Sequence, residues 1–228
     1  MTETAGGGAD AGGGSPPVER IAAGPEDHRG RAVQRAVEVL RPGGLFAHPT
    51  STVYGLGARA VPELDAVVAR LKGYAEDRPL IRLAASNTQV RQRRPEVEWP
   101  EAADRLAERF WPGGLTLVLD DGSEAGIAVR VDGHPVARAV PAALDDLVSS
   151  TSLNRSGGEP ARDPDQAMEV LSAMAPLGRP CAFLDAGPLA DSPPSTILTL
   201  REDPPRLLRA GAVEPGALRE CLRIEIAR

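Results

Sequence analysis

Short apolar runs alternate with amphipathic helical patterns along most of this sequence, and this alternation limits the fold classes that it can adopt. Residues 26–41 place five apolar side chains at helical spacing before Pro42-Gly43-Gly44 ends the pattern. Leu45-Phe46-Ala47 follows as a short apolar strand, and residues 62–72 form a second helical pattern. Alternation of this kind predicts an α/β layered domain.

Later segments repeat the alternation. Further strands are predicted at residues 79–84, 115–120, 126–131, 147–152, 181–185 and 195–200. Further helices are predicted at residues 100–110, 135–147, 164–174 and 215–221. Because the connections differ in length, we expect a single domain with a twisted mixed sheet, rather than a purely parallel sheet, and flanking helices.

The two ends of the chain differ from this periodic part. Residues 1–24 are rich in glycine and poor in large apolar side chains, so we expect them to form a flexible tail. Residues 25–211 are expected to form the domain, and residues 212–228 a short C-terminal extension. The first residues lack the basic and apolar regions of a secretory signal, and no apolar run approaches the ~18 residues of a membrane span, which predicts a soluble cytoplasmic protein.

Charge and cysteine content exclude several functional classes. The net charge is −6, which argues against coating of the whole surface by nucleic acid but leaves a local basic groove open. Cys181 and Cys221 lie far from each other and from His28, His48 and His134 in sequence. This spacing favours buried, unreactive thiols over a disulfide framework or a zinc site.

Polar residues gather at the ends of predicted strands, where open α/β sheets usually bind ligands. Hydroxyls, an amide, an ammonium and guanidiniums are all present there, and these groups suit phosphates and carboxylates. The chain has no G-x-x-x-x-G-K-[ST] loop and no G-x-G-x-x-G turn after a strand. Ser152 also lacks the G-x-S-x-G context of a hydrolase nucleophile.

The order of these clusters resembles one family. The matching segments are Pro49-Thr50-Ser51-Thr52-Val53-Tyr54-Gly55-Leu56-Gly57, Lys72-Gly73, Phe110-Trp111-Pro112-Gly113-Gly114-Leu115-Thr116, Val129-Arg130, Ser152-Leu153-Asn154-Arg155-Ser156-Gly157, Ser195-Thr196-Ile197 and Leu208-Arg209-Ala210-Gly211. Seven segments in register over about residues 27–211 resemble the YrdC-like threonylcarbamoyl-adenylate synthases. The resemblance implies a YrdC-like twisted sheet with a concave, positively lined ligand-binding face.

The resemblance also implies a reaction. Members of the family make threonylcarbamoyl-AMP and pyrophosphate from L-threonine, bicarbonate and ATP, with Mg²⁺ carried by the triphosphate. A partner enzyme then transfers the threonylcarbamoyl group to an adenosine of tRNA. An L-threonylcarbamoyladenylate synthase of this kind is a nucleotidyltransferase that needs no covalent enzyme intermediate.

Site residues follow from the matched positions. Lys72, the only lysine among 26 lysines and arginines, matches the catalytic lysine at the phosphates and carbamate. The resemblance implies that Ser152, Asn154 and Arg209 surround the nucleotide and its phosphates. It further implies that threonine is bound by Thr52, Arg130 and Ser195.

One departure from the family pattern keeps a second function open. The family motif Lys-x-Arg-Pro reads Lys72-Gly73-Tyr74-Ala75 here, so a phosphate-binding arginine is replaced by a phenol without charge at neutral pH. Arg78 lies four residues further on and is expected to restore this charge at the ATP phosphates. The alternative is a divergent paralogue that binds nucleotide or double-stranded RNA, or uses another carbamoylated substrate, without making this product.

Several of these residues also have purely structural interpretations. Thr50 and Thr52 are typical of a hydrogen-bonded turn, and Asn154 of a left-handed turn. Arg130 is also compatible with a charge on the sheet surface that pairs with a carboxylate such as Asp132. Trp111 is expected to pack in the core.

A basic cluster gives the sequence one candidate contact with tRNA or other RNA. Arg91, Arg93 and Arg94 lie close together, but Glu96 and Glu98 follow them. Mixed charge of this kind more often forms a solvated face.

Overall fold

The computed structural model describes residues 18–24, 30–75, 79–155, 157–174, 178–224 and 226–227. Its strands are β1 (Val18–Ala22), β2 (Leu45–Pro49), β3 (Tyr54–Arg59), β4 (Ile81–Leu83), β5 (Leu115–Leu119), β6 (Ile127–Arg130), β7 (Val148–Ser152), β8 (Cys181–Asp185), β9 (Thr196–Thr199) and β10 (Arg206–Arg209). Its helices are α1 (Arg31–Leu40), α2 (Pro62–Lys72), α3 (Asn87–Arg93), α4 (Glu101–Phe110), α5 (Pro135–Leu144), α6 (Pro164–Met174) and α7 (Pro215–Leu222).

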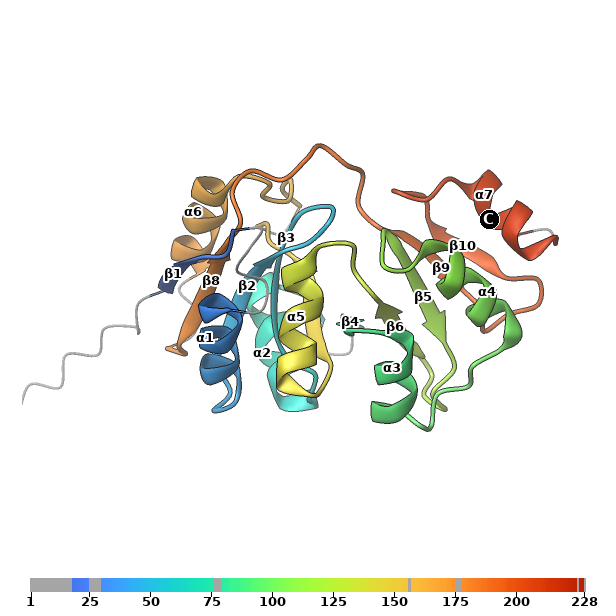
Figure 1. The fold of residues 1–228 in the computed structure, drawn as a ribbon, viewed down its shortest axis with the longest axis horizontal. Coiled ribbons are helices and arrows are strands. Elements are labelled where there is room, and N and C mark those ends of the chain that lie inside the picture. Colours follow the sequence, from blue (N-terminus) through green and yellow to red (C-terminus); the bar gives the residue numbers. More distant parts are fainter. Residues whose placement is uncertain are drawn as a thin grey trace, which may run out of the picture.

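All described strands belong to one twisted sheet in the order β1-β8-β2-β3-β7-β4-β6-β5-β9-β10 (Figure 1). The sheet combines parallel pairs, such as β2 with β8 and β5 with β9, with antiparallel pairs, such as β2 with β3 and β3 with β7. The predicted mixed α/β sheet is therefore confirmed. The order also brings β3, β4 and β7, which are distant in sequence, side by side at the centre of the sheet.

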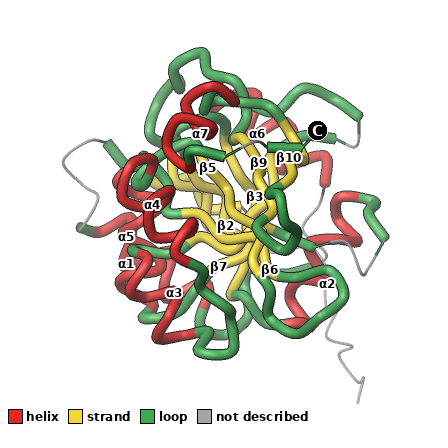
Figure 2. Tube along the Cα trace, turned by 90° about the vertical axis from the view of Figure 1, so that its right-hand side faces the viewer, coloured by secondary structure: helices red, strands yellow, loops and turns green. Residues whose placement is uncertain are grey.

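Helices cover both faces of the sheet, and three apolar clusters form the core. The α1 and α5 side chains pack with Phe46 and Val148 on one face, whereas α2 and α6 pack with Leu56 and Phe183 on the other. A third cluster joins α4 and α7 to the β5 end of the sheet. Figure 2 shows the strands at the centre, with α1, α3, α4 and α5 on one side and α2 on the opposite side.

The predicted boundaries at both ends of the chain need correction. The prediction of a flexible tail through residue 24 is wrong for β1, which pairs in parallel with β8. β1 is an edge strand with several exposed side chains, so its sequence lacks the apolar density of a central strand. The residues after 211 are not a separate extension, because Leu218, Leu222 and Ile226 are buried in the core. Residues 1–17 lie outside the described ranges.

Three other elements, β3, α3 and β10, were not predicted. β3 contains Gly55 and Gly57, and glycine normally weakens a strand. Here the small residue is required, because a Cβ at Gly57 would lie 1.9 Å from the carbonyl oxygen of Ser149 on β7. The glycines allow close approach of neighbouring strands, which pattern reasoning does not detect.

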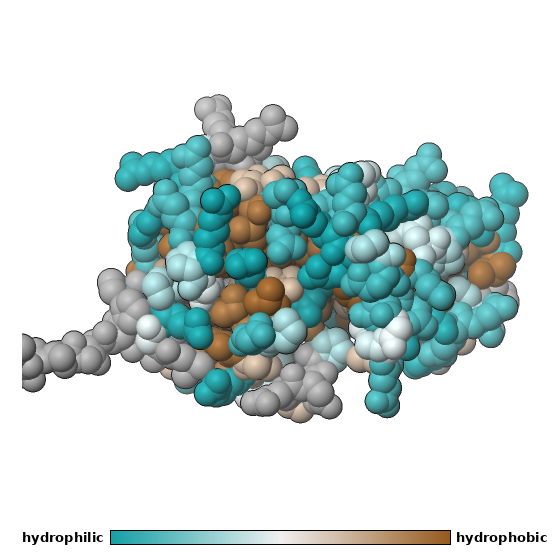
Figure 3. Space-filling view, turned by 90° about the horizontal axis from the view of Figure 1, so that it is seen from below, coloured by the Kyte–Doolittle hydropathy of each residue, from teal (hydrophilic) through white to brown (hydrophobic). Residues whose placement is uncertain are grey.

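Hydrophilic residues dominate the face of the molecule seen in Figure 3, with a smaller hydrophobic area near its middle. Among the described residues, no helix combines the length and the apolar character that a bilayer crossing requires.

Candidate functional site

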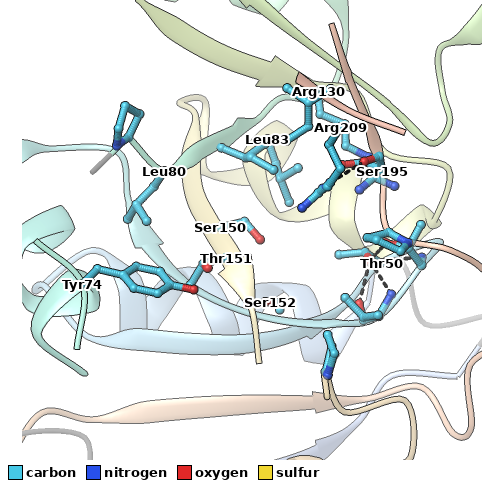
Figure 4. A pocket seen from close by; sticks show the side chains of 18 residues that line it. Thr50, Tyr74, Leu80, Leu83, Arg130, Ser150, Thr151, Ser152, Ser195 and Arg209 are labelled. Carbon is cyan, nitrogen blue, oxygen red and sulfur yellow. Dashed lines mark hydrogen bonds between the residues drawn. The ribbon is translucent and has the colours of Figure 1, made fainter. Parts of the chain in front are cut away.

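A pocket opens over the central strands and collects several of the predicted site residues (Figure 4). Thr52, Arg130, Ser152, Ser195 and Arg209 all line it. These side chains come from the turn before β3, from the ends of β6, β7 and β10, and from the residue before β9. Arg78 lies outside the described residues, so its predicted role is not tested by the geometry.

A hydroxyl-bonded turn shapes one wall of this pocket. The Thr50 hydroxyl donates to the Val53 carbonyl oxygen at 2.6 Å and accepts from the Val53 amide at 3.1 Å. The structural interpretation of Thr50 is thus confirmed. Thr50 and Thr52 place their hydroxyl oxygens 3.1 Å apart, and Thr52 is buried at the pocket wall.

Arg130 is held by a buried network at the end of β6. Its Nη2 lies 2.6 Å from Oδ2 of Asp132 and donates to the Ser51 hydroxyl at 2.9 Å, while its Nε donates to the Gly113 carbonyl oxygen at 2.9 Å. The ion pair with Asp132 is therefore confirmed, but the prediction of a surface charge is wrong, because both side chains are buried. Burial lowers the pKa of Arg130 from its usual value, and the Asp132 carboxylate raises it.

Arg209 approaches the same part of the pocket from β10. Its Nε donates to the Ser195 carbonyl oxygen at 2.9 Å, and its Nη2 donates to the Ser195 hydroxyl at 2.9 Å. Its pKa is lowered by burial and, to a smaller extent, by the charge of Arg130. Arg209, predicted beside the nucleotide, therefore lies with two of the predicted threonine-binding residues.

The two guanidiniums leave room for an anion. Among the described residues, the Nη1 nitrogens of Arg130 and Arg209 have no hydrogen-bond acceptor, and both side chains line the pocket. Arginine forks bind carboxylates and phosphates in paired geometry. An anionic group of a ligand in this pocket can therefore accept hydrogen bonds from these nitrogens.

Lys72 lies behind the pocket wall, at the last position of α2. This helix begins with Pro62 and is capped at its C-terminus by Gly73, whose φ of 64° is in the left-handed region. The ammonium donates to the carbonyl oxygens of Ser152 at 2.8 Å and Asn154 at 2.6 Å, and also to Oδ1 of Asn154. Lys72 is 1% exposed, so in this structure it fixes the end of β7 from behind.

Asn154 links Lys72 to Ser152, which does line the pocket. The Ser152 hydroxyl donates to Oδ1 of Asn154 at 2.8 Å, and the Asn154 amide donates to the Gly158 carbonyl oxygen at 2.7 Å. The interpretation of Asn154 as a left-handed turn residue is wrong, because its φ is not positive. The structure thus brings Lys72, Ser152 and Asn154 together in one hydrogen-bonded group.

Tyr74 lines the pocket at the end opposite Arg130 (Figure 4). The Lys72 ammonium lies 5.6 Å from the centre of its ring, a distance at which a cation interacts with an aromatic face. The aromatic replacement of the family arginine is therefore a component of the site.

Sequence reasoning missed Ser150, a residue of β7 that also lines the pocket. Its hydroxyl contacts the buried ring of His48, which directly precedes the Pro49-Thr50 motif. The serine-rich run Ser149-Ser150-Thr151-Ser152 was a signal for this strand, but the pattern does not say which hydroxyls face the pocket.

The candidate RNA cluster is engaged with the protein itself. Arg91 pairs with Asp104 and stacks on Trp99, and Arg93 pairs with Asp145. Arg94 donates to the Ala60 carbonyl oxygen at 3.1 Å. The structure therefore favours a solvated surface of intramolecular ion pairs over contact with RNA.

Metal-binding side chains are not grouped within the described ranges: no three histidine, cysteine, aspartate or glutamate residues there are placed to hold an ion.

Trp111 packs against the core, and its indole donates to the Leu115 carbonyl oxygen at 2.7 Å, as its structural interpretation predicted.

Comparison with known proteins identifies the family of this chain. The Sua5/YciO/YrdC protein family, described as "Telomere recombination", matches residues 38–211. The chain belongs to this family. The matched range contains every predicted site residue.

Relatives of this family member carry related names. A putative threonylcarbamoyl-AMP synthase of Mycobacterium leprae is 35% identical over 87% of this chain and 91% of its own length. The threonylcarbamoyl-AMP synthase of Pyrococcus abyssi is 36% identical over 79% of this chain. The chain covers 54% of that protein, and thus spans about half the length of some relatives and nearly all of others.

Solved structures extend the comparison to the fold. Pyrococcus abyssi Sua5 in complex with L-threonine superposes with a TM-score of 0.77 at 30% identity, covering 92% of this chain and 62% of that one. Escherichia coli YciO gives a TM-score of 0.72 at 22% identity, covering 87% and 97%. The YrdC-like fold expected from the sequence is confirmed.

Proposed function

We propose that this protein is an L-threonylcarbamoyladenylate synthase, which converts L-threonine, bicarbonate and ATP to threonylcarbamoyl-AMP and pyrophosphate. The observation that carries the proposal is the pairing of Arg130 and Arg209 in one pocket with Ser195, at the opposite end from Tyr74. Relatives named threonylcarbamoyl-AMP synthase and a family structure bound to L-threonine support the choice of substrate.

The chemistry has an electrostatic problem that these residues address. The threonine amine reacts with bicarbonate to give a carbamate and water. A carbamate oxygen then attacks the α-phosphorus of ATP, a new P–O bond forms, and the bond to pyrophosphate breaks. Since nucleophile and electrophile are both anionic, cations must lower their repulsion, and positioning supplies much of the remaining acceleration.

Each part of the pocket has a role in this scheme. Arg130 and Arg209 bind the threonine carboxylate through their Nη1 nitrogens, and Thr52 and Ser195 contact the amino acid. Ser195 suits a carboxylate because its oxygen already accepts from Arg209 and from Thr116, leaving its own O–H to donate.

The nucleotide occupies the other end, near Ser152, Asn154 and Lys72. An ammonium has three N–H bonds, and three protein oxygens accept from Lys72. Lys72 therefore contacts the phosphates or carbamate by exchanging a partner, such as Oδ1 of Asn154, for a ligand oxygen. Arg78 is proposed to supply the charge that Tyr74 lacks.

Mg²⁺ belongs to this proposal as an ion bound to the triphosphate. No step is assigned to the ion. The product would be used in the cytoplasm by a threonylcarbamoyl transferase acting on tRNA.

A second candidate function rests on Tyr74 and Lys72. Because the pocket carries a phenol instead of a guanidinium, and because Lys72 is engaged by protein oxygens, a paralogue that binds a nucleotide without this turnover is the alternative. Pyrophosphate release from ATP separates the two functions. Release that requires both L-threonine and bicarbonate supports the synthase, whereas nucleotide binding without release supports the paralogue.

A further inference from the structure

A buried hydrogen-bonded pair, His48 and Ser150, lies at the floor of the pocket. Nε2 of His48, on β2, is 3.1 Å from the hydroxyl oxygen of Ser150, on β7. β3 runs between these strands, and Gly55 on β3 leaves the space for the contact, because a Cβ there would lie 2.9 Å from both atoms. His48 is completely buried, whereas Ser150 lines the pocket.

The other nitrogen of His48 determines the direction of this hydrogen bond. Nδ1 lies 3.3 Å from the Pro49 carbonyl oxygen, which can only accept, so the proton of the neutral ring resides on Nδ1. Burial supports the neutral form, since it lowers the pKa of His48 to about 3. Nε2 is then an acceptor, and the Ser150 hydroxyl donates to it.

Ser150 consequently presents only oxygen lone pairs to the pocket. Ser195 has the opposite polarity, because its oxygen accepts from two protein groups and its own proton is left for a ligand. A carboxylate or phosphate gains nothing from an acceptor such as Ser150. The ligand group that Ser150 can bind is therefore an N–H or O–H donor.

We propose that Ser150 contacts the amino nitrogen of the amino-acid substrate, and that His48 is the positioning residue that fixes its hydroxyl as an acceptor. The assignment rests on the proposed function. With the carboxylate on Arg130 and Arg209, the amino nitrogen must face the nucleotide, because the carbamate forms on it. Figure 4 shows Ser150 between Tyr74 and the Arg130–Arg209 end, where this nitrogen would lie.

The first test compares two buried serines that are neighbours on β7. Ser150→Ala is expected to raise KM for L-threonine about tenfold or more, since a hydrogen bond from a charged group is lost, and to leave KM for ATP within about twofold. Ser149→Ala is the matched control: the Ser149 hydroxyl bonds to the backbone of Ala58 and does not line the pocket. An unchanged KM for L-threonine in Ser150→Ala overturns the proposal.

The second test addresses His48. His48→Leu removes the acceptor and is expected to raise KM for L-threonine with little change in kcat, whereas His48→Gln, which retains an acceptor oxygen, restores a KM close to the original. Thermal unfolding of both variants is measured in parallel. If His48→Leu lowers only the melting temperature, or if His48→Gln is as defective in KM, the positioning role is wrong.

Failure of the proposed function is distinguishable from failure of this inference. Unaltered protein without threonine-dependent pyrophosphate release would contradict the synthase proposal and the substrate assigned to Ser150. Normal turnover in the unaltered protein, with no effect of Ser150→Ala, would contradict the inference alone. If His48→Leu does not fold, Ser150→Ala tests the substrate contact and His48→Gln tests the positioning role.

Discussion

The guanidinium of Arg130 and the carboxylate of Asp132 form an ion pair of 2.6 Å, and their side chains are only 5% and 0% exposed. Asp132 also accepts from the backbone amides of Ser51 and His134 at 2.8 and 2.7 Å. One buried carboxylate thus fixes the arginine, the Thr50 turn and the start of α5. The Arg130 end of the pocket is organised around this group.

Removal of the Asp132 charge should destabilise the protein. Asp132→Asn leaves the Arg130 charge buried without its partner, and breaking a buried pair costs about 3–5 kcal/mol. Glu220→Gln, which removes an exposed pair with Arg109, is the control and should cost about 1 kcal/mol or less. Urea unfolding measures both. Equal losses in the two variants would show that Asp132 has no special structural role.

Tyr74 and Arg78 should respond differently to substitution. Arg78→Ala is expected to reduce the rate of pyrophosphate release about 10²-fold or more, because it removes the charge proposed to compensate for Tyr74. Tyr74→Arg should leave the rate unchanged or raise it, with a lower KM for ATP. Steady-state kinetics with varied ATP provide the measurement. Full activity of Arg78→Ala would refute the compensation.

Buried histidine should make the fold sensitive to acid. Burial lowers the pKa of His48 to about 3, with smaller lowering effects from His134 and Arg130. The unfolded chain binds a proton near pH 6.5 and the folded chain does not, so this contribution to stability is complete above pH 6.5 and is lost as the pH falls towards 3. From pH 8 to pH 5 the loss from His48 is about 2 kcal/mol.

The pH effect is checked by urea unfolding at both pH values, with His48→Gln as the comparison. The variant should lose less stability on acidification, because its amide does not titrate. His134 has a pKa lowered mainly by burial and keeps its own contribution in both proteins. Identical losses in the two proteins would mean that His48 is not the group responsible.

Cys181 should be inert in the folded protein. It is 1% exposed, and burial raises the pKa of its thiol to about 12, so almost no reactive thiolate forms at neutral pH. A thiol reagent should therefore modify no more than one cysteine in the native state and both after denaturation. Rapid reaction of two thiols in native protein would show that the β8 end of the sheet opens.

The sequence predicted the parts of the fold that depend on local periodicity. The helices at α2 and α4 and the buried strands at β5 and β8 have strong apolar patterns and were placed within a few residues. β3 was missed because the close approach of β7, a strand some ninety residues away, decides its glycines. β1 was missed because it pairs with β8 at the sheet edge and leaves several side chains exposed, so its sequence has no strong apolar pattern.

The candidate site shows the same division. Arg130, Ser195 and Ser152, which the resemblance assigned to the site, line one pocket, but the resemblance did not indicate that Arg209 would donate hydrogen bonds to Ser195. Nor did it indicate that the Lys72 ammonium would donate hydrogen bonds to the carbonyl oxygens of Ser152 and Asn154, at and just after the end of β7. These relationships depend on which side chains the sheet order brings together, and no local pattern encodes that order.

The most direct test of the central claim is mass spectrometry of the product formed with ¹³C-labelled bicarbonate. Purified protein is incubated with ATP, Mg²⁺, L-threonine and the label, and the nucleotide fraction is analysed together with released pyrophosphate. We predict threonylcarbamoyl-AMP carrying one ¹³C, in amounts equal to the pyrophosphate, and none when L-threonine is omitted. Pyrophosphate without this product, or release independent of L-threonine, would contradict the account.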